Sequence, residues 1–128
     1  MAPISACGID LVDIARVRKL VECSTADVLQ NIFSKHELDY AGDSVSSFAR
    51  LAARFAAKEA CLKLFPKETA TRLIELSDFS IMHDSYGAPC VALSPRASTL
   101  ADQYGYVLIS ISLSHTKTHA IAIAIASS

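Results

Sequence analysis

Residues 54–63 read Arg-Phe-Ala-Ala-Lys-Glu-Ala-Cys-Leu-Lys, and this stretch decides the fold. It belongs to a pattern that predicts one long helix from about Ser46 to Phe65, which Pro66 stops. Alanines at positions 49, 52, 53, 56 and 57 favour the helix and permit close packing. One helical stripe combines four apolar residues with a carboxylate, at steps of three or four: Phe48, Leu51, Phe55, Glu59 and Leu62. The helix is therefore predicted to hold a carboxylate on or beside its packed face.

Glu59 supports two interpretations. A desolvated carboxylate needs a cation or a metal ion to hold its charge, and Arg54, Lys58 and Lys63 lie within two helical turns of it. A carboxylate ringed by cations is what a site for magnesium and a polyphosphate requires. The alternative is an ordinary surface pair between Glu59 and Lys63, worth about 0.3–0.5 kcal/mol.

The rest of the chain predicts an α+β fold. Strict alternation of apolar and small residues over 107–114 and 120–126 predicts a final hairpin, whose small face would let the central helix approach closely. A strand is expected over 3–14 and a second hairpin over 79–83 and 90–93. Four short helices are expected: over 16–22, from a cap at Ser24 to Phe33, from Ser34 to Tyr40, and from Pro95 to about Gly105. Residues 67–74 are predicted to be irregular or weakly helical. We expect one domain over residues 1–128, an antiparallel sheet with the long helix packed on it.

Composition narrows the classes of function. The 128 residues are 52% hydrophobic and carry a net charge of −1, which argues against a general nucleic-acid binder. No apolar run reaches the roughly 18 residues of a membrane span, and no secretory leader pattern opens the chain. The four scattered cysteines predict free thiols in a reducing compartment, hence the cytoplasm. Arg16, Arg18 and Lys19 form a local basic cluster that suits an acidic partner.

Asp10 is the second candidate ligand. It interrupts the otherwise apolar run Gly8-Ile9-Asp10-Leu11-Val12-Asp13-Ile14, where it either caps a turn or joins Glu59 as a hard oxygen ligand for Mg²⁺. Two other patterns predict little. His115 and His119 have zinc-like spacing but straddle a hairpin turn, and Ser114 precedes His115 on a strand, where adjacent side chains point to opposite faces.

Three blocks of the sequence resemble the signatures of the holo-acyl-carrier-protein synthases, the small bacterial-type 4′-phosphopantetheinyl transferases. The first is Gly8-Ile9-Asp10 followed by Asp13-Ile14-Ala15-Arg16, and the second is the 54–60 stretch with Lys63 and Phe65. The third is Ser112-Leu113-Ser114-His115-Thr116. Their order, spacing and total length agree with that family, so the resemblance covers essentially the whole chain.

The resemblance implies an enzyme that moves the 4′-phosphopantetheine arm of coenzyme A to a serine of apo-acyl carrier protein and releases adenosine 3′,5′-bisphosphate. It implies that Asp10 and Glu59 hold Mg²⁺ against the pyrophosphate and that Lys63 neutralises phosphate oxygens. Arg54, Lys58, His115 and Thr116 become candidates for binding coenzyme A, and Arg16 for docking the acidic carrier, to which its charge adds Arg18 and Lys19. The base that takes the serine proton is either Glu59 or a metal-bound water near Asp10.

The family also implies a homotrimer with active sites between subunits. This chain departs from the family pattern at Ala6, where glycine is usual, and at Pro66-Lys67-Glu68-Thr69-Ala70, which replaces a glycine-containing segment. The altered segment motivates an alternative, a non-catalytic protein on the same scaffold that binds coenzyme A or the carrier.

Overall fold

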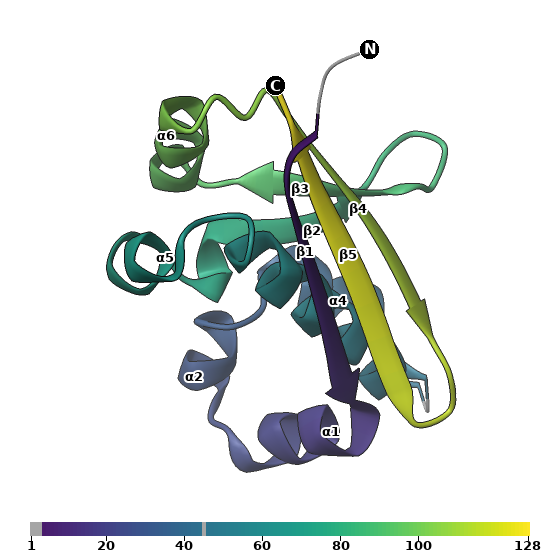
Figure 1. The fold of residues 1–128 in the computed structure, drawn as a ribbon. Helices are drawn as coiled ribbons and strands as arrows, with labels where there is room; N and C mark the ends of the chain where they lie inside the picture. Colours follow the sequence, from purple (N-terminus) through teal and green to yellow (C-terminus); the bar gives the residue numbers. More distant parts are fainter. Residues whose placement is uncertain (1–3, 45) are drawn as a thin grey trace.

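The computed structural model describes residues 4–44 and 46–128, and it confirms the predicted α+β class. Helix α4, Ser47–Leu62, runs behind a three-stranded sheet in Figure 1. The sheet has the order β1-β5-β4, formed by Ile4–Asp13, His119–Ser127 and Leu108–His115, and both of its pairings are antiparallel. The prediction of a long helix packed on an antiparallel sheet therefore holds.

The two strands of the final hairpin present opposite patterns to α4. On β5 the small residues face inward, with Ala120, Ala122, Ala124 and Ala126 all buried, as the sequence predicted. On β4 the bulky residues Ile109, Ile111 and Leu113 are half-buried against the core, and the serines face outward. Alanines on the central strand thus let the helix come close, and larger side chains fill the space towards the sheet edge.

The deepest face of α4 is not the predicted stripe of larger residues. Ala52, Ala56, Ala57 and Ala60 are fully buried, whereas of the stripe only Leu51 is buried and the other members are half-exposed. The expectation that the stripe forms the packed face was wrong in this respect, because the short alanine side chains allow the closer contact with the sheet. Glu59 consequently lies beside the packed face, on its border.

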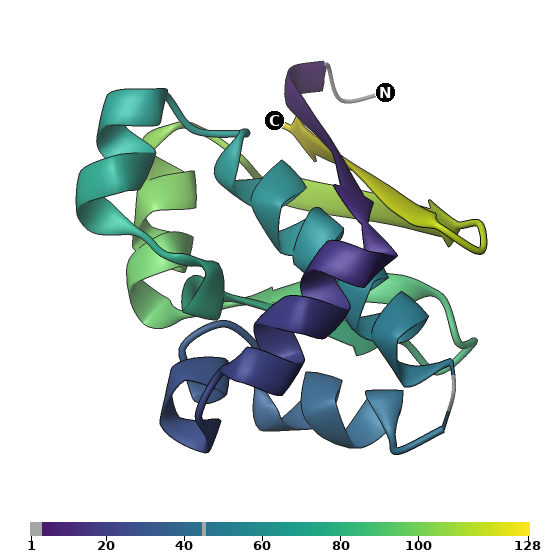
Figure 2. The same ribbon diagram turned by 90° about the horizontal axis from the view of Figure 1, so that it is seen from below.

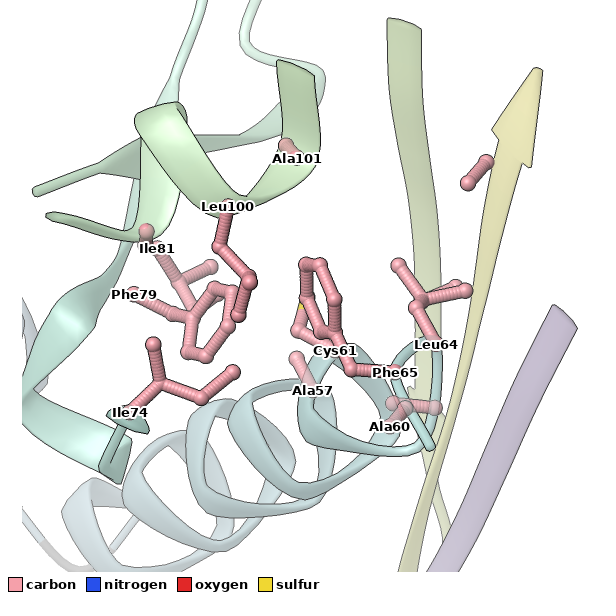
Figure 3. Packing of buried hydrophobic residues seen from close by; sticks show 14 of the residues in the cluster. Ala57, Ala60, Cys61, Leu64, Phe65, Ile74, Phe79, Ile81, Leu100 and Ala101 are labelled. Carbon is pink, nitrogen blue, oxygen red and sulfur yellow. The ribbon is translucent and has the colours of Figure 1, made fainter. Parts of the chain in front are cut away.

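A second layer packs on the other side of α4. It contains the hairpin β2–β3, Phe79–His83 and Pro89–Leu93, which follows the short 3₁₀ turn η1, Leu76–Asp78, and precedes helix α6, Pro95–Gln103. Figure 3 shows Phe65, Phe79 and Leu100 gathered between α4 and α6, in the main hydrophobic core. Burial raises the pKa of the Cys61 thiol in this core to about 12, so this cysteine is chemically inert.

Residues 67–73 settle an ambiguous sequence prediction. Of the two alternatives, irregular or weakly helical, the structure shows a helix, α5, Lys67–Leu73. Helix α4 ends at Leu62, before the predicted end at Phe65, and Pro66 serves as the N-cap of α5, where its carbonyl accepts from the amide of Ala70. The segment that replaces the family's glycine-containing stretch is therefore ordered as a helical turn beside the end of α4.

The N-terminal helices cover the start of α4. Helix α1, Ile14–Cys23, packs on α4 in the view of Figure 2, and it is followed by α2, Ala26–Gln30, and α3, Lys35–Ala41. The predicted capping box of Ser34 and Glu37 is present, whereas the cap of α2 is Thr25 and not Ser24. None of the helices in the described ranges is both long and apolar enough to cross a bilayer.

The outer face of the main sheet is apolar and uncovered. Ile9 and Leu11 of β1 are 57% and 62% exposed, and Ile121 and Ile123 of β5 are each 38% exposed. Successive side chains of a strand point to opposite faces of the sheet, and Ile9 and Leu11 lie directly across from Ile123 and Ile121. These four residues therefore share the face opposite α4. A continuous apolar face of this kind is typical of a protein interface.

Candidate active site between strand β1 and helix α4

Gly8 lets strand β1 touch the last turns of helix α4. A Cβ atom at this position would lie 2.1 Å from the carbonyl oxygen of Ala60 and 3.0 Å from the Cβ of Lys63, so no larger residue fits. Asp10 follows two residues later on the same inward face of the strand. The close approach therefore brings Asp10 to the helix turn that carries Glu59 and Lys63.

Lys63 ties the strand to the end of the helix. Its Nζ donates to the carbonyl oxygen of Ile9 at 2.8 Å and to Oδ1 of Asp10 at 3.2 Å. The interpretation of Glu59 and Lys63 as a surface pair is thus not realised, since Lys63 turns to Asp10. Over residues 4–44 and 46–128, Glu59 forms neither an ion pair nor a side-chain hydrogen bond.

The environment of Glu59 disfavours its negative charge. Burial raises the pKa of this carboxyl, the carboxylate of Asp10 raises it further, and Lys63 and Arg16 act in the opposite direction. Two carboxylates that repel one another beside a lysine form an arrangement that a bound cation would relieve. The physical setting inferred from the helical stripe, a partly desolvated carboxylate with cations nearby, is present here.

A cavity of about 490 Å³ opens beside the two carboxylates. Its walls come from β1, α1, α4 and the turn after α2, and they are mostly apolar apart from Asp10, Glu59 and Arg16. The lining residues are Asp10, Leu11, Val12, Arg16, Val17, Leu20, Ile32, Phe55 and Glu59. A ligand here would meet charge at one end and apolar side chains at the other.

A second cavity, of about 640 Å³, lies along the end of α4 and α5. It is lined by Leu62, Lys63, Phe65, Lys67, Ala70, Thr71 and Ile74. Because Lys63 lines this cavity and also contacts Asp10, a single anionic ligand could reach from the carboxylate pair into it.

The hairpin turn residues His115 and Thr116 do not join this site in the single chain. His115 and Thr116 line a separate open hollow with Ile14, Ser46 and Lys117, at the far end of the sheet. Thr116 is held in the turn, where its Oγ1 accepts from the amides of Thr118 and His119 at 3.2 Å and 3.1 Å. His119 pairs with Asp13 at 2.8 Å.

Lys58 and Arg54 lie on another face of α4. The ammonium of Lys58 is fully buried and donates to Oε1 of Glu37 at 2.6 Å, and the other oxygen of Glu37 accepts from the amide of Ile81. Arg54 is 6% exposed and contacts Tyr40 and His83. Neither cation reaches Glu59 in the same subunit.

The predicted carrier-docking residues all lie on helix α1. Arg16 is exposed and lines the cavity next to the carboxylates. Arg18 pairs with Glu22 at 3.0 Å and lies 5.2 Å over the ring of Phe48, whereas Lys19 is exposed. The basic cluster is therefore real as a surface feature, and its first member borders the candidate active site.

The donor set at Asp10 and Glu59 fits a magnesium ion. Within the described residues there is no group of three or more His, Cys, Asp or Glu side chains that could cage a metal, which argues against a dedicated protein-only site. Mg²⁺ typically takes one or two carboxylates and completes its octahedron with phosphate oxygens and water. Burial first, and then repulsion from Asp10, raise the pKa of Glu59, and a bound cation would offset both.

Sequence reasoning missed two parts of the site. Gly8 was quoted as part of a motif, but its role as the contact point between β1 and α4 depends on the packing of two distant segments. Phe55 lines the cavity although its helical stripe indicated only packing, and Val17 also lines it without having been singled out by the sequence. A signal for the first was available, since a glycine within a strand marks a close backbone approach.

Comparison with known proteins now places the chain. Residues 6–124 match the family model described as the 4′-phosphopantetheinyl transferase superfamily. The chain belongs to this superfamily. Among curated relatives of this transferase, the holo-[acyl-carrier-protein] synthase of Carboxydothermus hydrogenoformans is 36% identical over 118 residues, covering 92% of this chain and 94% of the relative. The enzyme of the same name from Thermoanaerobacter sp. is 34% identical over 119 residues, covering 93% and 84%.

Solved structures agree with the superfamily assignment. A holo-[acyl-carrier-protein] synthase from Neisseria meningitidis superposes on this transferase with a TM-score of 0.80 at 26% identity, covering 97% of this chain and 98% of that one. The Helicobacter pylori enzyme of that name, solved in complex with coenzyme A, gives a TM-score of 0.75 at 31% identity and covers 94% and 99%. The recognised motifs thus belong to a chain whose whole fold matches the family.

Proposed function

We propose that this chain is a holo-[acyl-carrier-protein] synthase that transfers the 4′-phosphopantetheine arm of coenzyme A to a serine of apo-acyl carrier protein. The names of its relatives and the coenzyme complex of the Helicobacter pylori enzyme support this activity. The observation that carries it is local: Asp10, Glu59 and Lys63 meet at one point between two cavities. Residues 1–128 would form one transferase domain.

The two cavities suit two substrates that meet at Lys63. The anionic coenzyme would extend along the cavity shared by Lys63 and Lys67, and the serine of the carrier would enter from the side of Arg16. Phosphoryl transfer depends mainly on alignment and on neutralising charge, and Lys63 offers one cation at the point where both substrates would meet. The ties of Lys63 to Ile9 and Asp10 would fix its position before substrates bind.

Asp10 and Glu59 would together hold Mg²⁺. When bound, the ion would neutralise the pyrophosphate and stabilise the departing adenosine 3′,5′-bisphosphate. The incoming serine must lose a proton, and its acceptor would be either Glu59, which borders the cavity, or a metal-bound water near Asp10.

The apolar outer face of the sheet supports a homotrimer. Ile9, Leu11, Ile121 and Ile123 would be covered by neighbouring subunits. Assembly would also explain why Arg54, His115 and Thr116 lie away from Glu59 in one subunit. In this proposal they bind the adenosine-phosphate end of a coenzyme seated on the neighbour. Lys58, buried against Glu37, would support the fold at this point and not contact the coenzyme.

Helix α1 would dock the carrier. Arg16 borders the active-site cavity and Lys19 is exposed on the same helix, so an acidic surface could be held with its serine near Glu59. Arg18 would contribute less, because Glu22 already partners its guanidinium. The free thiols Cys7, Cys23, Cys61 and Cys90 support a cytoplasmic setting.

Two isosteric variants test the assignment of the site. Asp10→Asn and Glu59→Gln remove the charge that would hold the metal ion and keep the shape of each side chain. Each should abolish transfer to an apo-carrier while the variant melts close to the wild type. Arg18→Gln is a matched surface control and should retain most of the activity. Full activity in both Asp10→Asn and Glu59→Gln would refute the proposed roles of the two carboxylates.

A further inference from the structure

Arg54 is a buried cation without a carboxylate. Its guanidinium lies 4.4 Å from the ring centroid of Tyr40, and its Nη1 donates to the carbonyl oxygen of Arg50 at 3.3 Å. Among the described residues it forms no ion pair, and its buried Nε has no hydrogen-bond partner. A buried guanidinium normally has an anion, so this one has capacity for an anion that the subunit itself does not supply.

His83 occupies the remaining end of this guanidinium. Its Nε2 lies 3.0 Å from Nη2 of Arg54. Since arginine can only donate, this nitrogen must accept, so His83 is neutral here and carries its proton on Nδ1. The imidazole also stacks on Tyr40, with ring centroids 4.4 Å apart. Tyr40 is 45% exposed and His83 half-buried, so an anion can approach the cluster from their side.

The charges around His83 are mostly positive. Helix α4 contributes Arg54 and also Arg50, which lies over the ring of Tyr40. Helix α3 contributes His36, whose ring centroid lies 6.5 Å from that of His83. Burial lowers the pKa of His83 most, the positive charges of Arg54 and His36 lower it further, and Asp84 acts in the opposite direction.

The two neighbouring carboxylates are occupied. Glu37 binds Lys58 and the amide of Ile81, and Asp84 accepts from the amides of Tyr86 and Ala88 in the hairpin turn. The cluster thus presents several cationic groups, and residues 4–44 and 46–128 offer it no free anion.

We propose that His83 couples binding of the coenzyme's 3′-phosphate to uptake of a proton. In the empty protein the neutral imidazole accepts from Arg54. An incoming phosphate monoester takes over the donors of Arg54 and Arg50, which frees Nε2 of His83 to bind a proton from solvent and donate to the same phosphate. This inference rests on the proposed function, because Arg54 would reach the coenzyme of a neighbouring subunit.

The sign of the pH dependence follows from this exchange of partners. A dianion beside His83 favours the imidazolium, so the bound complex carries more protons than the free protein near pH 6.5. The phosphate monoester has a second pKa of about 6 and loses the fraction of a proton that it still carries when it binds as a dianion, so the net uptake at pH 6.5 stays below one proton. By linkage, affinity for coenzyme A rises as the pH falls through this range wherever that net uptake is positive. A coenzyme that lacks the 3′-phosphate gives no such uptake.

Calorimetric titration of the full chain with Mg²⁺ tests the inference. Coenzyme A and 3′-dephospho-coenzyme A are each titrated at pH 6.5 in two buffers with low and high ionisation enthalpy. We expect proton uptake with coenzyme A alone, and the dephospho form should bind at least about tenfold more weakly, a difference of about 1.4 kcal/mol. His83→Gln, which keeps an acceptor for Arg54 but does not titrate, should lose the uptake. His36→Gln, the matched histidine control, should retain it.

The outcomes separate this inference from the function on which it rests. Equal uptake with both coenzymes in the wild type, or uptake that persists in His83→Gln, overturns the role of His83. If that variant does not fold, the two coenzymes are compared on His115→Gln, because His115 is the other histidine proposed at this end of the coenzyme; loss of the uptake in His115→Gln would assign the proton to His115 and overturn the role of His83. Transfer to a carrier by the same preparation would leave the proposed function standing, whereas a preparation that neither binds coenzyme A nor modifies any carrier would refute both.

Discussion

Replacing Gly8 with alanine should separate the two carboxylates of the active site. The new Cβ would lie 2.1 Å from the carbonyl oxygen of Ala60, whereas real Cβ contacts are essentially never below 3.0 Å. Strand β1 must therefore move by at least about 0.9 Å, because the obstacle is backbone of a buried helix. Overpacking of this kind costs about 1–3 kcal/mol. Asp10, two residues away, would move with the strand.

The consequence for activity should exceed the consequence for stability. A displacement of about 1 Å in a reacting geometry can cost about 100-fold in rate. We expect kcat/KM for transfer to fall by about that factor, while urea unfolding shows a protein that is still folded. Steady-state kinetics with coenzyme A and an apo-carrier, together with urea titration, measure both quantities.

Gly87→Ala is the matched control. Its Cβ would meet nothing within 4 Å, but its backbone φ of 81° is strained for alanine, so it should lose stability without moving Asp10. Wild-type kcat/KM in Gly8→Ala would refute the argument that this contact sets the site. An equal loss of activity in the two glycine variants would show instead that general destabilisation is responsible.

Three further predictions concern the buried pair, the titration of Glu59 and the outer face. Lys58→Met leaves Glu37 charged and buried, so it should lower the free energy of unfolding in urea by about 3–5 kcal/mol. The double variant Lys58→Met with Glu37→Gln should recover part of this loss. A loss below about 1 kcal/mol in Lys58→Met would contradict the prediction. The folded-state pKa of Glu59 is raised above its ordinary value of 4.5, so the stability that this group contributes is present below pH 4.5 and is lost as the pH rises through the raised value. Mg²⁺ favours the ionised form of Glu59, so the rise in Tm that added Mg²⁺ causes should grow as the pH increases from 4.5 through the raised pKa. In Glu59→Gln this rise in Tm should not grow with pH. A pH-independent rise in the wild type would argue against this ion site. If the chain forms the proposed trimer, Ile123→Lys on the outer sheet face should convert it to monomers in light scattering, whereas Leu73→Lys, at a 53% exposed position on α5, should not. The same trimer in both variants would exclude this face as the interface.

The sequence was sufficient for the elements with strong local patterns. The alternation in the final hairpin predicted both β4 and β5, and the Ser34–Glu37 capping box predicted the start of α3. The weak pattern after Pro66 left residues 67–74 open between an irregular and a weakly helical segment, because helix α5 buries none of its residues fully and so shows no clear apolar stripe. Periodicity also identified Glu59 as unusual, but it did not distinguish the border of the buried face from its centre.

The pairwise geometry of the site depended on the tertiary structure. Motifs named Asp10, Glu59 and Lys63, and the structure brings all three together. Proximity in sequence wrongly grouped Lys58 with Glu59, since adjacent helical residues point about 100° apart and Lys58 meets a carboxylate 21 positions earlier. The cluster of Arg54, Tyr40 and His83 joins three elements, and no spacing rule along the chain predicts it.

The most direct test of the account is the intact mass of an apo-acyl carrier protein after incubation with this chain, coenzyme A and Mg²⁺. Transfer predicts a gain of about 340 Da, the phosphopantetheine arm, which disappears when EDTA removes the metal ion. Glu59→Gln should give no gain under the same conditions. A folded protein that adds no mass to any of several acidic carriers would contradict the proposed transferase and would favour a binding role on the same scaffold.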